Sequence, residues 1–145
     1  MKISVKKLHN DAPLPTFGSP LAAGADLYAF IPEGQVTIPP HETAMIGTGL
    51  AMAIPVGYWG GIYARSGIAL RRGLRPANVP GVIDADYRGE IKIALHNDTN
   101  DPQTVKHGDR IAQLLITSVP EITYEEVVEL DDTERGNGGF GHTGI

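Results

Sequence analysis

The chain has 145 residues, 41% of them hydrophobic, and a formal net charge of −5 at pH 7. A domain of this length buries about 68–70% of the surface that its unfolded chain exposes, so we expect one domain with one core. The apolar runs are far shorter than the roughly 20 residues of a membrane helix, and the start shows no secretion signal. The negative charge argues against a general nucleic-acid binder, which needs broad basic surface.

Cysteine is absent from the sequence. This absence excludes disulfides, thiolate metal sites and cysteine nucleophiles. A reducing compartment fits such a composition, and we therefore expect a soluble, cytoplasmic protein with no membrane partner.

Turn residues recur at short intervals along the chain and separate segments that suit strands. Apolar and polar residues alternate at residues 3–5, 36–38 and 91–95, which is the two-residue period of a half-buried strand. Many short strands with little helical sequence between them predict an all-β sandwich or jelly roll.

Residues 66–73 (SGIALRRG) break this pattern and predict a short helix. Ser66 is a suitable N-cap, Arg71 and Arg72 fall in the last turn, and Gly73 is a typical stop. The helix would begin beside Arg65 and Gly67, a guanidinium and a glycine that suit a phosphate site. An ordinary helix cap is the alternative interpretation of the same tripeptide.

Positive charge is concentrated in one part of this acidic chain. All seven arginines lie from Arg65 onward, and five of them fall within residues 65–88. Such a cluster can form a local anion site, although a solvated basic face is the more ordinary outcome of a charge cluster.

Residues 81–91 (GVIDADYRGEI) place two acids and an aromatic ring before an alternating strand. If the segment is a regular strand, Asp84 and Asp86 share one face and Tyr87 takes the other, so the acids and the ring cannot both point into the core. An ionised aspartate can orient or deprotonate a water beside an electrophile. A charged hairpin on the surface is the alternative.

The final stretch, residues 135–145, holds five glycines, one arginine and one aromatic ring. Residues 136–141 match G-x-G-x-x-G formally, but the sequence shows no βαβ unit around them, so we reject dinucleotide binding. A lid that closes over a charged, aromatic ligand would use both the arginine and the ring, whereas a floppy tail needs neither. We predict a domain over residues 1–134 and a flexible lid of that domain over residues 135–145.

The five histidines are scattered without metal-ligand spacing, and no nucleophile elbow, Walker A loop or zincin helix is present. The signals described above, taken together and in order, resemble the five motifs of trimeric dUTPases. The matching segments are residues 23–29 (AGADLYA), 64–67 (ARSG), 81–91, 108–114 (GDRIAQL) and 135–144 (RGNGGFGHTG). They span nearly the whole chain. Ala64 and His142 depart from the commonest family pattern, but neither touches an assigned role.

This resemblance implies an all-β jelly-roll (β-clip-like) subunit with one short helix. It also implies a homotrimer whose active sites each combine three chains. The implied reaction is hydrolysis of dUTP to dUMP and pyrophosphate by water attack at the α-phosphorus. That reaction limits uracil entry into DNA and supplies dUMP for thymidylate synthesis, with neither nucleic acid nor membrane as a partner.

By the same resemblance, Asp84 holds and activates the attacking water. Asp26 supports a magnesium ion through bound water, and the ion is chelated by the three phosphates without a direct protein ligand. The residues expected to hold phosphate oxygens are Arg65, Ser66, Gly67 and Gln113. Arg110 has a more structural role.

The nucleoside is expected to sit against the turn from Asn78 to Asp84, where the Asn78 amide and backbone groups of Val82 and Ile83 imitate a pairing base. Tyr87 would lie under the deoxyribose and exclude a 2′-hydroxyl, with Lys92 near the base pocket. The resemblance assigns the remaining contacts to the C-terminal segment, with Phe140 over the uracil, Arg135 on the γ-phosphate and Gly141 allowing closure.

Two other functions compete with this interpretation. A dCTP deaminase of the same fold would need a different constellation at the base. A nucleotide-sensing or purely structural jelly-roll protein would lack catalysis, and the presence of Asp84 with a complete tail argues against it.

Overall fold

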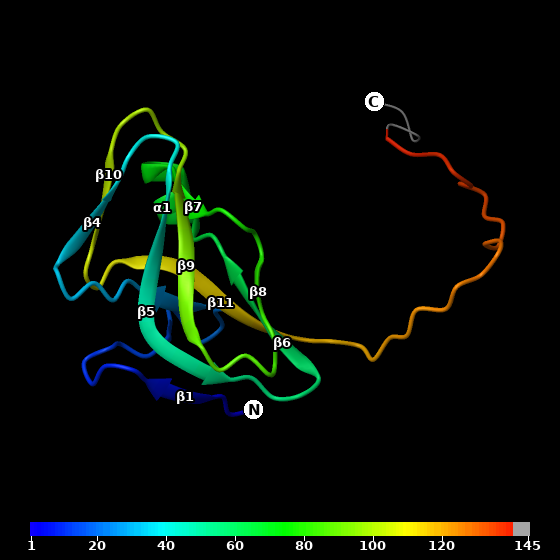
Figure 1. The fold of residues 1–145 in the computed structure, drawn as a ribbon, viewed down its shortest axis with the longest axis horizontal. Helices are drawn as coiled ribbons and strands as arrows, with labels where there is room; N and C mark the ends of the chain where they lie inside the picture. The colour runs from blue at the N-terminus through cyan, green and yellow to red at the C-terminus, as the bar shows by residue number, and fades with distance from the viewer. Residues whose placement is uncertain (141–145) are drawn as a thin grey trace.

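The structure is a computed structural model that describes residues 1–140. Those residues form eleven strands and one short helix, α1 (Ser66–Arg72). The strands are β1 (Ser4–Lys7), β2 (Thr16–Phe17), β3 (Ala25–Tyr28), β4 (Gln35–Ile38), β5 (Thr43–Ala53), β6 (Tyr58–Tyr63), β7 (Leu74–Pro76), β8 (Gly81–Ile83), β9 (Glu90–Asn97), β10 (Gln103–Lys106) and β11 (Arg110–Ser118). The all-β fold that the turn spacing predicts is confirmed, as is the short helix expected over residues 66–73 (Figure 1).

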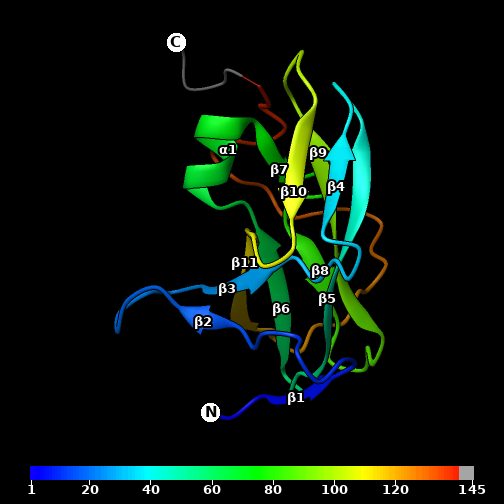
Figure 2. The same ribbon diagram turned by 90° about the vertical axis from the view of Figure 1, so that its left-hand side faces the viewer.

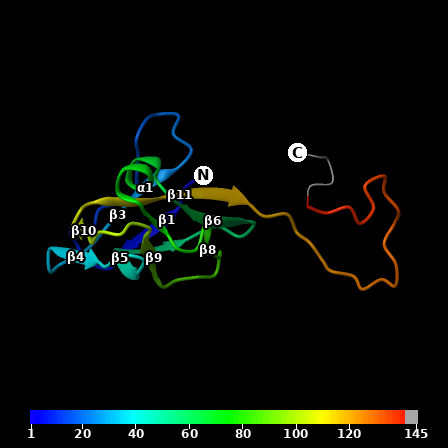
Figure 3. The same ribbon diagram turned by 90° about the horizontal axis from the view of Figure 1, so that it is seen from above.

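The strands form two facing sheets and a smaller ribbon. One sheet has four strands in the order β1-β5-β9-β7, and the other has five in the order β2-β3-β11-β6-β8. Strands β10 and β4 pair in a two-stranded ribbon, and the strand pairs are antiparallel. Figures 2 and 3 show β5 and β9 on one side of the body and β3, β11 and β6 on the other. This layered arrangement is that of a jelly roll.

The core lies between the sheets because their strands alternate in burial. In β9 the side chains of Ile91, Ile93 and Leu95 are buried, whereas Lys92 between them is exposed. Each such side chain stabilises the fold by about 1.5–3 kcal/mol relative to full exposure. The outward residues of β9 are therefore free to line a surface cavity.

Strand β5 bends between Gly47 and Ala51, where its register with β9 shifts. Gly49 has a φ of +68° at this bend, and a Cβ there would lie 2.9 Å from the Ala12 side chain, so glycine is required. The Gly49 amide donates to the Glu90 carboxylate over 3.0 Å. This hydrogen bond links the bend in β5 to Glu90, the first residue of β9.

Helix α1 ends as predicted and begins differently. Gly73 caps its C-terminus with a φ of 61° and donates its amide to Ala69. The N-cap position is Arg65 and not Ser66, and within the described residues Arg65 makes no side-chain capping bond. The prediction of a capping serine was wrong by one position, because Arg65 already has the extended backbone of an N-cap and Ser66 is the first helical residue.

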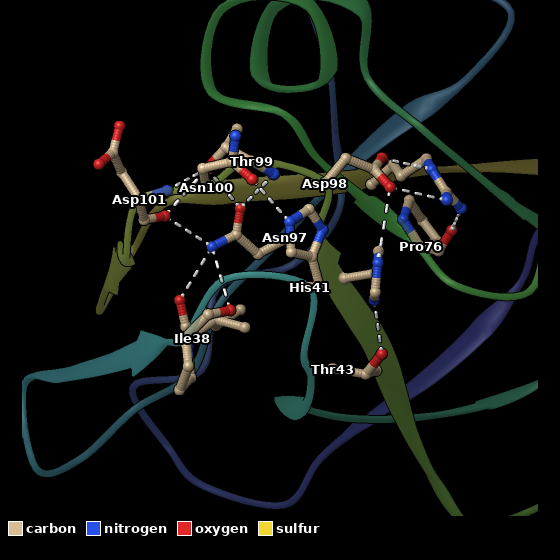
Figure 4. Close-up of polar contacts among 12 residues, drawn as sticks. Ile38, His41, Thr43, Pro76, Asn97, Asp98, Thr99, Asn100 and Asp101 are labelled. Carbon is tan, nitrogen blue, oxygen red and sulfur yellow. Dashed lines mark hydrogen bonds and ion pairs between the residues drawn. The ribbon is translucent and has the colours of Figure 1, made fainter.

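Asn97 joins the end of β9 to two other segments (Figure 4). Its side chain is fully buried and its Nδ2 donates to the carbonyls of Ile38, Pro39 and Asp101 over 2.9–3.1 Å. Its Oδ1 accepts from both the amide and the hydroxyl of Thr99. One amide thus satisfies several backbone groups of the β4 and β10 connections.

Beside Asn97, the exposed carboxylate of Asp98 accepts two hydrogen bonds from Arg75, over 2.6 and 2.9 Å (Figure 4). The Arg75 hydrogen bond lowers the pKa of Asp98 below its ordinary value. Such an exposed pair contributes less than about 1 kcal/mol to stability.

The described part of the chain beyond β11 contains neither helix nor strand. Figures 1 and 3 show residues 119–140 leaving the body and extending to one side. Ile122, Tyr124 and Val128 along this segment are exposed. The division of the chain into residues 1–134 and a lid over residues 135–145 stays a prediction.

Candidate active site

The five-stranded sheet carries a nearly buried carboxylate, Asp26, which is ion-paired with two arginines. Asp26 on β3 is 8% exposed. Arg65 Nε donates to its Oδ1 over 2.6 Å, and an Arg110 guanidinium nitrogen donates to its Oδ2 over 3.2 Å. These two cations compensate for the loss of water around the carboxylate. Asp26 in turn orients both guanidiniums.

A cavity of about 220 Å³ opens beside this ion-paired group. The predicted phosphate contacts Arg65, Ser66, Gly67 and Gln113 all line it, together with Asp26 and Arg110. The Gln113 amide is fixed because its Nε2 donates to the Ala64 carbonyl over 2.8 Å.

Gly24 adjoins this arrangement, and a Cβ there would lie 2.8 Å from the Gln113 side-chain oxygen. The sequence motif contains this glycine, but no signal in the sequence pairs it with Gln113.

A second cavity, of about 300 Å³, lies between β8, the start of β9 and the turn that joins them. Met45 on β5, Pro76 on β7 and Ala94 on β9 also line it. The predicted nucleoside and water contacts that line it are Asn78, Val82, Ile83, Asp84, Tyr87 and Lys92.

Asp84 and Tyr87 line the same cavity, which a regular strand would not allow. Strand β8 ends at Ile83, and the Tyr87 amide donates to the Asp84 carbonyl over 3.2 Å to close a turn. The condition of a regular strand over residues 81–91 is not met, because this turn replaces strand geometry after Ile83.

The Tyr87 ring is held by two neighbours. Its hydroxyl donates to the Glu90 carbonyl over 3.0 Å. Gly89 leaves room for the ring, because a Cβ at residue 89 would lie 2.6 Å from Tyr87 Cζ. Tyr87 is 43% exposed, so part of this residue is accessible to a ligand.

Glu90 also lines the second cavity and was not singled out from the sequence. Its Oε2 lies 3.6 Å from Lys92 Nζ, while its Oε1 accepts the Gly49 amide. The sequence does indicate that Glu90 and Lys92 lie side by side, because residues two apart in a strand share a face. Glu90 and Lys92 thus form a weak, solvent-exposed ion pair at the cavity edge.

The two cavities are well separated within one chain. Strands β3 and β8 are separated by β11 and β6, which is three strand spacings, or about 14 Å. Along the strands, Ile83 pairs with Gly60, whereas Gln113 beside Asp26 pairs with Tyr63, an offset of roughly 10 Å. A single chain does not bring Asp84 to the phosphate cavity.

The tail residues lie apart from both cavities in the described structure. Arg135 Nε donates to the Gly138 carbonyl within the tail, and Phe140 is fully exposed. Neither lines the cavity around Asp84 or the cavity beside Asp26, and Figures 1 and 3 show the tail away from the body of the protein. Gly141, and with it the 141–145 part of the predicted lid, lies outside the described residues.

No group of three or more His, Asp or Glu side chains among residues 1–140 is arranged to hold a metal ion. His9 stacks on Phe30, and His107 Nδ1 accepts a hydrogen bond from the Ile31 amide over 3.1 Å.

No helix among residues 1–140 is long and apolar enough to cross a membrane.

Comparison with known proteins decides the family. A family model described as dUTPase matches residues 10–144. The chain belongs to the dUTPase family. The resemblance carried by the five sequence motifs is thereby confirmed, as is the jelly-roll fold that it implies.

Relatives in the dUTPase family match over nearly the full chain. The deoxyuridine 5′-triphosphate nucleotidohydrolase of Syntrophotalea carbinolica is 52% identical over 143 residues, covering 99% of this chain and 97% of that one. The dUTPase of Staphylococcus bacteriophage 80alpha, solved with dUPNHPP, has a TM-score of 0.85 at 29% identity and 99% coverage of both chains. A mutant dUTPase of phage phi11 of S. aureus, with a structural Mg(II) ion, has a TM-score of 0.81 at 25% identity, covering 91% of this chain and all of that one.

Proposed function

We propose that this protein hydrolyses dUTP to dUMP and pyrophosphate by attack of water on the α-phosphorus. The observation that carries this proposal is the cavity that places Asp84, Tyr87 and Asn78 together on a chain of the dUTPase family. The 80alpha dUTPase solved with dUPNHPP, a dUTP analogue, supports the choice of nucleotide. In the cytoplasm the reaction would keep uracil out of DNA and supply dUMP for thymidylate synthesis.

The second cavity fits the nucleoside half of this substrate. The Asn78 amide both donates and accepts hydrogen bonds, as the uracil edge requires, and backbone groups of Val82 and Ile83 border the same space. The ring of Tyr87 would lie under the deoxyribose, where a 2′-hydroxyl would collide with it. Lys92, which is ion-paired with Glu90, would border the base.

Asp84 is the proposed base for the attacking water. Its carboxylate is exposed in the cavity and can accept a hydrogen bond from a water and then its proton. Phosphoryl transfer of this kind requires mainly positioning and charge neutralisation, so a covalent nucleophile is not needed. This explains how a chain without cysteine or a serine triad can be catalytic.

The cavity beside Asp26 fits the phosphate chain. Arg65, Ser66, Gly67 and Gln113 offer a guanidinium, a hydroxyl, a close backbone approach and an amide, while Arg110 orients Asp26.

We propose magnesium as the cofactor, chelated by the phosphates. When bound, the ion would neutralise phosphate charge. Both Asp26 oxygens are ion-paired, but each keeps a second lone pair, so Asp26 can accept a hydrogen bond from water near the ion. This donor set fits contact through water.

The separation of the two cavities supports a site shared between copies of the chain. The nucleoside cavity of one copy and the phosphate cavity of another would together hold one dUTP. We propose a homotrimer, in which a third copy supplies residues 135–145 as the lid of the domain formed by residues 1–134. In that lid Phe140 would cover the uracil, Arg135 would reach the γ-phosphate, and Gly141 would allow closure.

The experiment that tests the function is a screen of dUTP, dCTP, dTTP, dATP and dGTP with magnesium, measuring both pyrophosphate and ammonia. Pyrophosphate from dUTP with little from the other nucleotides is the expected result. Ammonia from dCTP would identify a deaminase instead. Binding of dUTP without release of pyrophosphate would indicate a nucleotide sensor.

A further inference from the structure

Glu90 lines the nucleoside cavity together with Asp84 and Lys92, and the proposed reaction gives it no role. Its side chain is 25% exposed, and its carboxylate is hydrogen-bonded to strand β5. Its backbone carbonyl accepts the hydrogen bond of the Tyr87 hydroxyl. Glu90 therefore connects β5 to the ring that is expected to contact the sugar.

The bend in β5 provides a fitted place for the Glu90 carboxylate. The Gly49 amide donates to Oε1 over 3.0 Å. Gly47 leaves the space that the carboxylate occupies, because an added Cβ there would lie 3.3 Å from Glu90 Cδ and closer still to Oε1. The register between β5 and β9 shifts between Gly47 and Ala51, so regular pairing is interrupted here. The bond from Gly49 thus ties the start of β9 to β5 where the ladder is irregular.

The position of the Tyr87 ring depends on Glu90 in turn. The Tyr87 hydroxyl donates to the Glu90 carbonyl over 3.0 Å, which is its one hydrogen bond among residues 1–140. Tyr87 lies in the turn after β8 and is partly exposed, so neither strand pairing nor full burial holds the ring. A displacement of the Glu90 carbonyl would therefore release the ring.

We propose that Glu90 is a positioning residue, which sets the preference for deoxyribose by holding Tyr87 in place from strand β5. This proposal rests on the proposed function, in which the Tyr87 ring opposes a 2′-hydroxyl. A ring discriminates between the two sugars only when it cannot move aside, so the groups that fix it contribute to specificity. The 3.6 Å ion pair of Glu90 with Lys92 is solvent-exposed and contributes little. The hydrogen-bond acceptor of Glu90 is the property that acts, and its charge is not.

The test measures the affinity of the intact protein, Glu90→Ala and Glu90→Gln for α,β-imido analogues of dUTP and of UTP by calorimetric titration. Loss of one hydrogen bond corresponds to a change of about fivefold, so Glu90→Ala should reduce the preference for the deoxyribose analogue by about fivefold. Glu90→Gln should keep the preference, because its amide oxygen can still accept the Gly49 amide. Equal weakening of both analogues in Glu90→Ala would indicate a merely structural role and would overturn the proposal. So would an equal loss of preference in Glu90→Gln.

A double-mutant cycle with Tyr87→Phe tests whether Glu90 acts through the tyrosine hydroxyl. Phenylalanine keeps the ring and removes the donor to the Glu90 carbonyl. Adding Glu90→Ala to Tyr87→Phe should therefore change the preference by less than about twofold, since the two residues act through one contact. Additive losses would show that Glu90 does not act through Tyr87.

Glu33→Ala is the matched control, because Glu33 is an exposed glutamate in the turn before β4. Its preference between the two analogues should equal that of the intact protein. Release of pyrophosphate from dUTP is measured separately and tests the proposed function. If the intact protein prefers the deoxyribose analogue but releases no pyrophosphate, the proposed function fails and the affinities still decide the role of Glu90. An intact protein that prefers neither sugar would overturn that role.

Discussion

Aspartate and asparagine side chains have nearly the same shape, but only the carboxylate can accept a proton. Replacing Asp84 with asparagine therefore tests its proposed role as a base. The carboxylate lines the nucleoside cavity beside Tyr87 and is not part of the core. We predict that Asp84→Asn lowers turnover of dUTP by at least about 100-fold, as loss of a general base does, and leaves nucleotide affinity within a few fold. Pyrophosphate release and analogue binding measure the two effects. Turnover near that of the intact protein would remove Asp84 from the mechanism.

The proposed preference for deoxyribose over ribose also depends on an individual residue, Tyr87. Tyr87→Ala should reduce the preference for dUTP over UTP by about tenfold or more, because the ring would no longer oppose a 2′-hydroxyl. Gly89→Ala should reduce it in the same direction, since the added Cβ would displace the Tyr87 ring. The ratio of kcat/KM for the two nucleotides is the measurement. An unchanged ratio in Tyr87→Ala would place discrimination elsewhere.

The sequence identified the types of residue in the cavities better than their geometry. The five motifs named Asp26, Arg65, Gln113 and Asp84, and the structure places each of them in a cavity. The turn after Ile83 was not predicted, because a two-residue alternation extends through residues 81–91 and hides the point at which the strand stops. The backbone bond between Tyr87 and Asp84 that closes this turn has no side-chain signature.

At the level of elements, the buried Asn97 side chain joins the end of β9 to the β4 and β10 connections. Asn97→Ala would leave the buried carbonyl of Ile38 and its neighbours without their donor, and we predict a loss of about 2–4 kcal/mol in the free energy of unfolding. Asn100→Ala is the control, because Asn100 is exposed and bonds only to exposed His41 in the described residues, and it should cost under about 1 kcal/mol. Urea unfolding at one fixed protein concentration compares them. Equal losses would contradict the central role of Asn97.

Elements with strong local signals were predicted, and those shaped by tertiary contacts were not. The alternation in β9 and the glycine after α1 both predicted the observed structure. The eleven-residue strand β5 has no such simple pattern, because it bends at Gly49 and is buried almost continuously along its second half. Its length depends on packing against β9 and β1, which the local sequence does not encode.

At the scale of the whole molecule, deleting the tail tests whether closure of the proposed lid over the nucleotide contributes to turnover. Ordering a glycine-rich segment costs about 1–2 kcal/mol per residue in backbone entropy, so residues 135–145 should settle only when Phe140 and Arg135 both find ligand groups. Deletion after Glu134 should lower turnover at saturating dUTP by at least about tenfold while the fold persists. Circular dichroism checks the fold and pyrophosphate release the rate. Equal turnover would show that the tail has no part in catalysis.

The chain order of the motifs does not reveal that the nucleoside and phosphate cavities lie far apart in one subunit. That separation follows from strand order, because β3 and β8 take opposite sides of β11 and β6. The proposed shared site rests on this separation. The family resemblance implies sharing, and the positions of the cavities support that proposal.

Subunit complementation tests this account most directly. Asp84→Asn and Arg65→Gln should each be nearly inactive alone, since each spoils every site. If a site takes Asp84 from one copy and Arg65 from another, equal mixing by co-refolding leaves about a quarter of the sites complete and restores about a quarter of the dUTPase activity. Mixed assemblies that stay as inactive as either variant alone would show that both residues act within one chain, and would contradict the shared site.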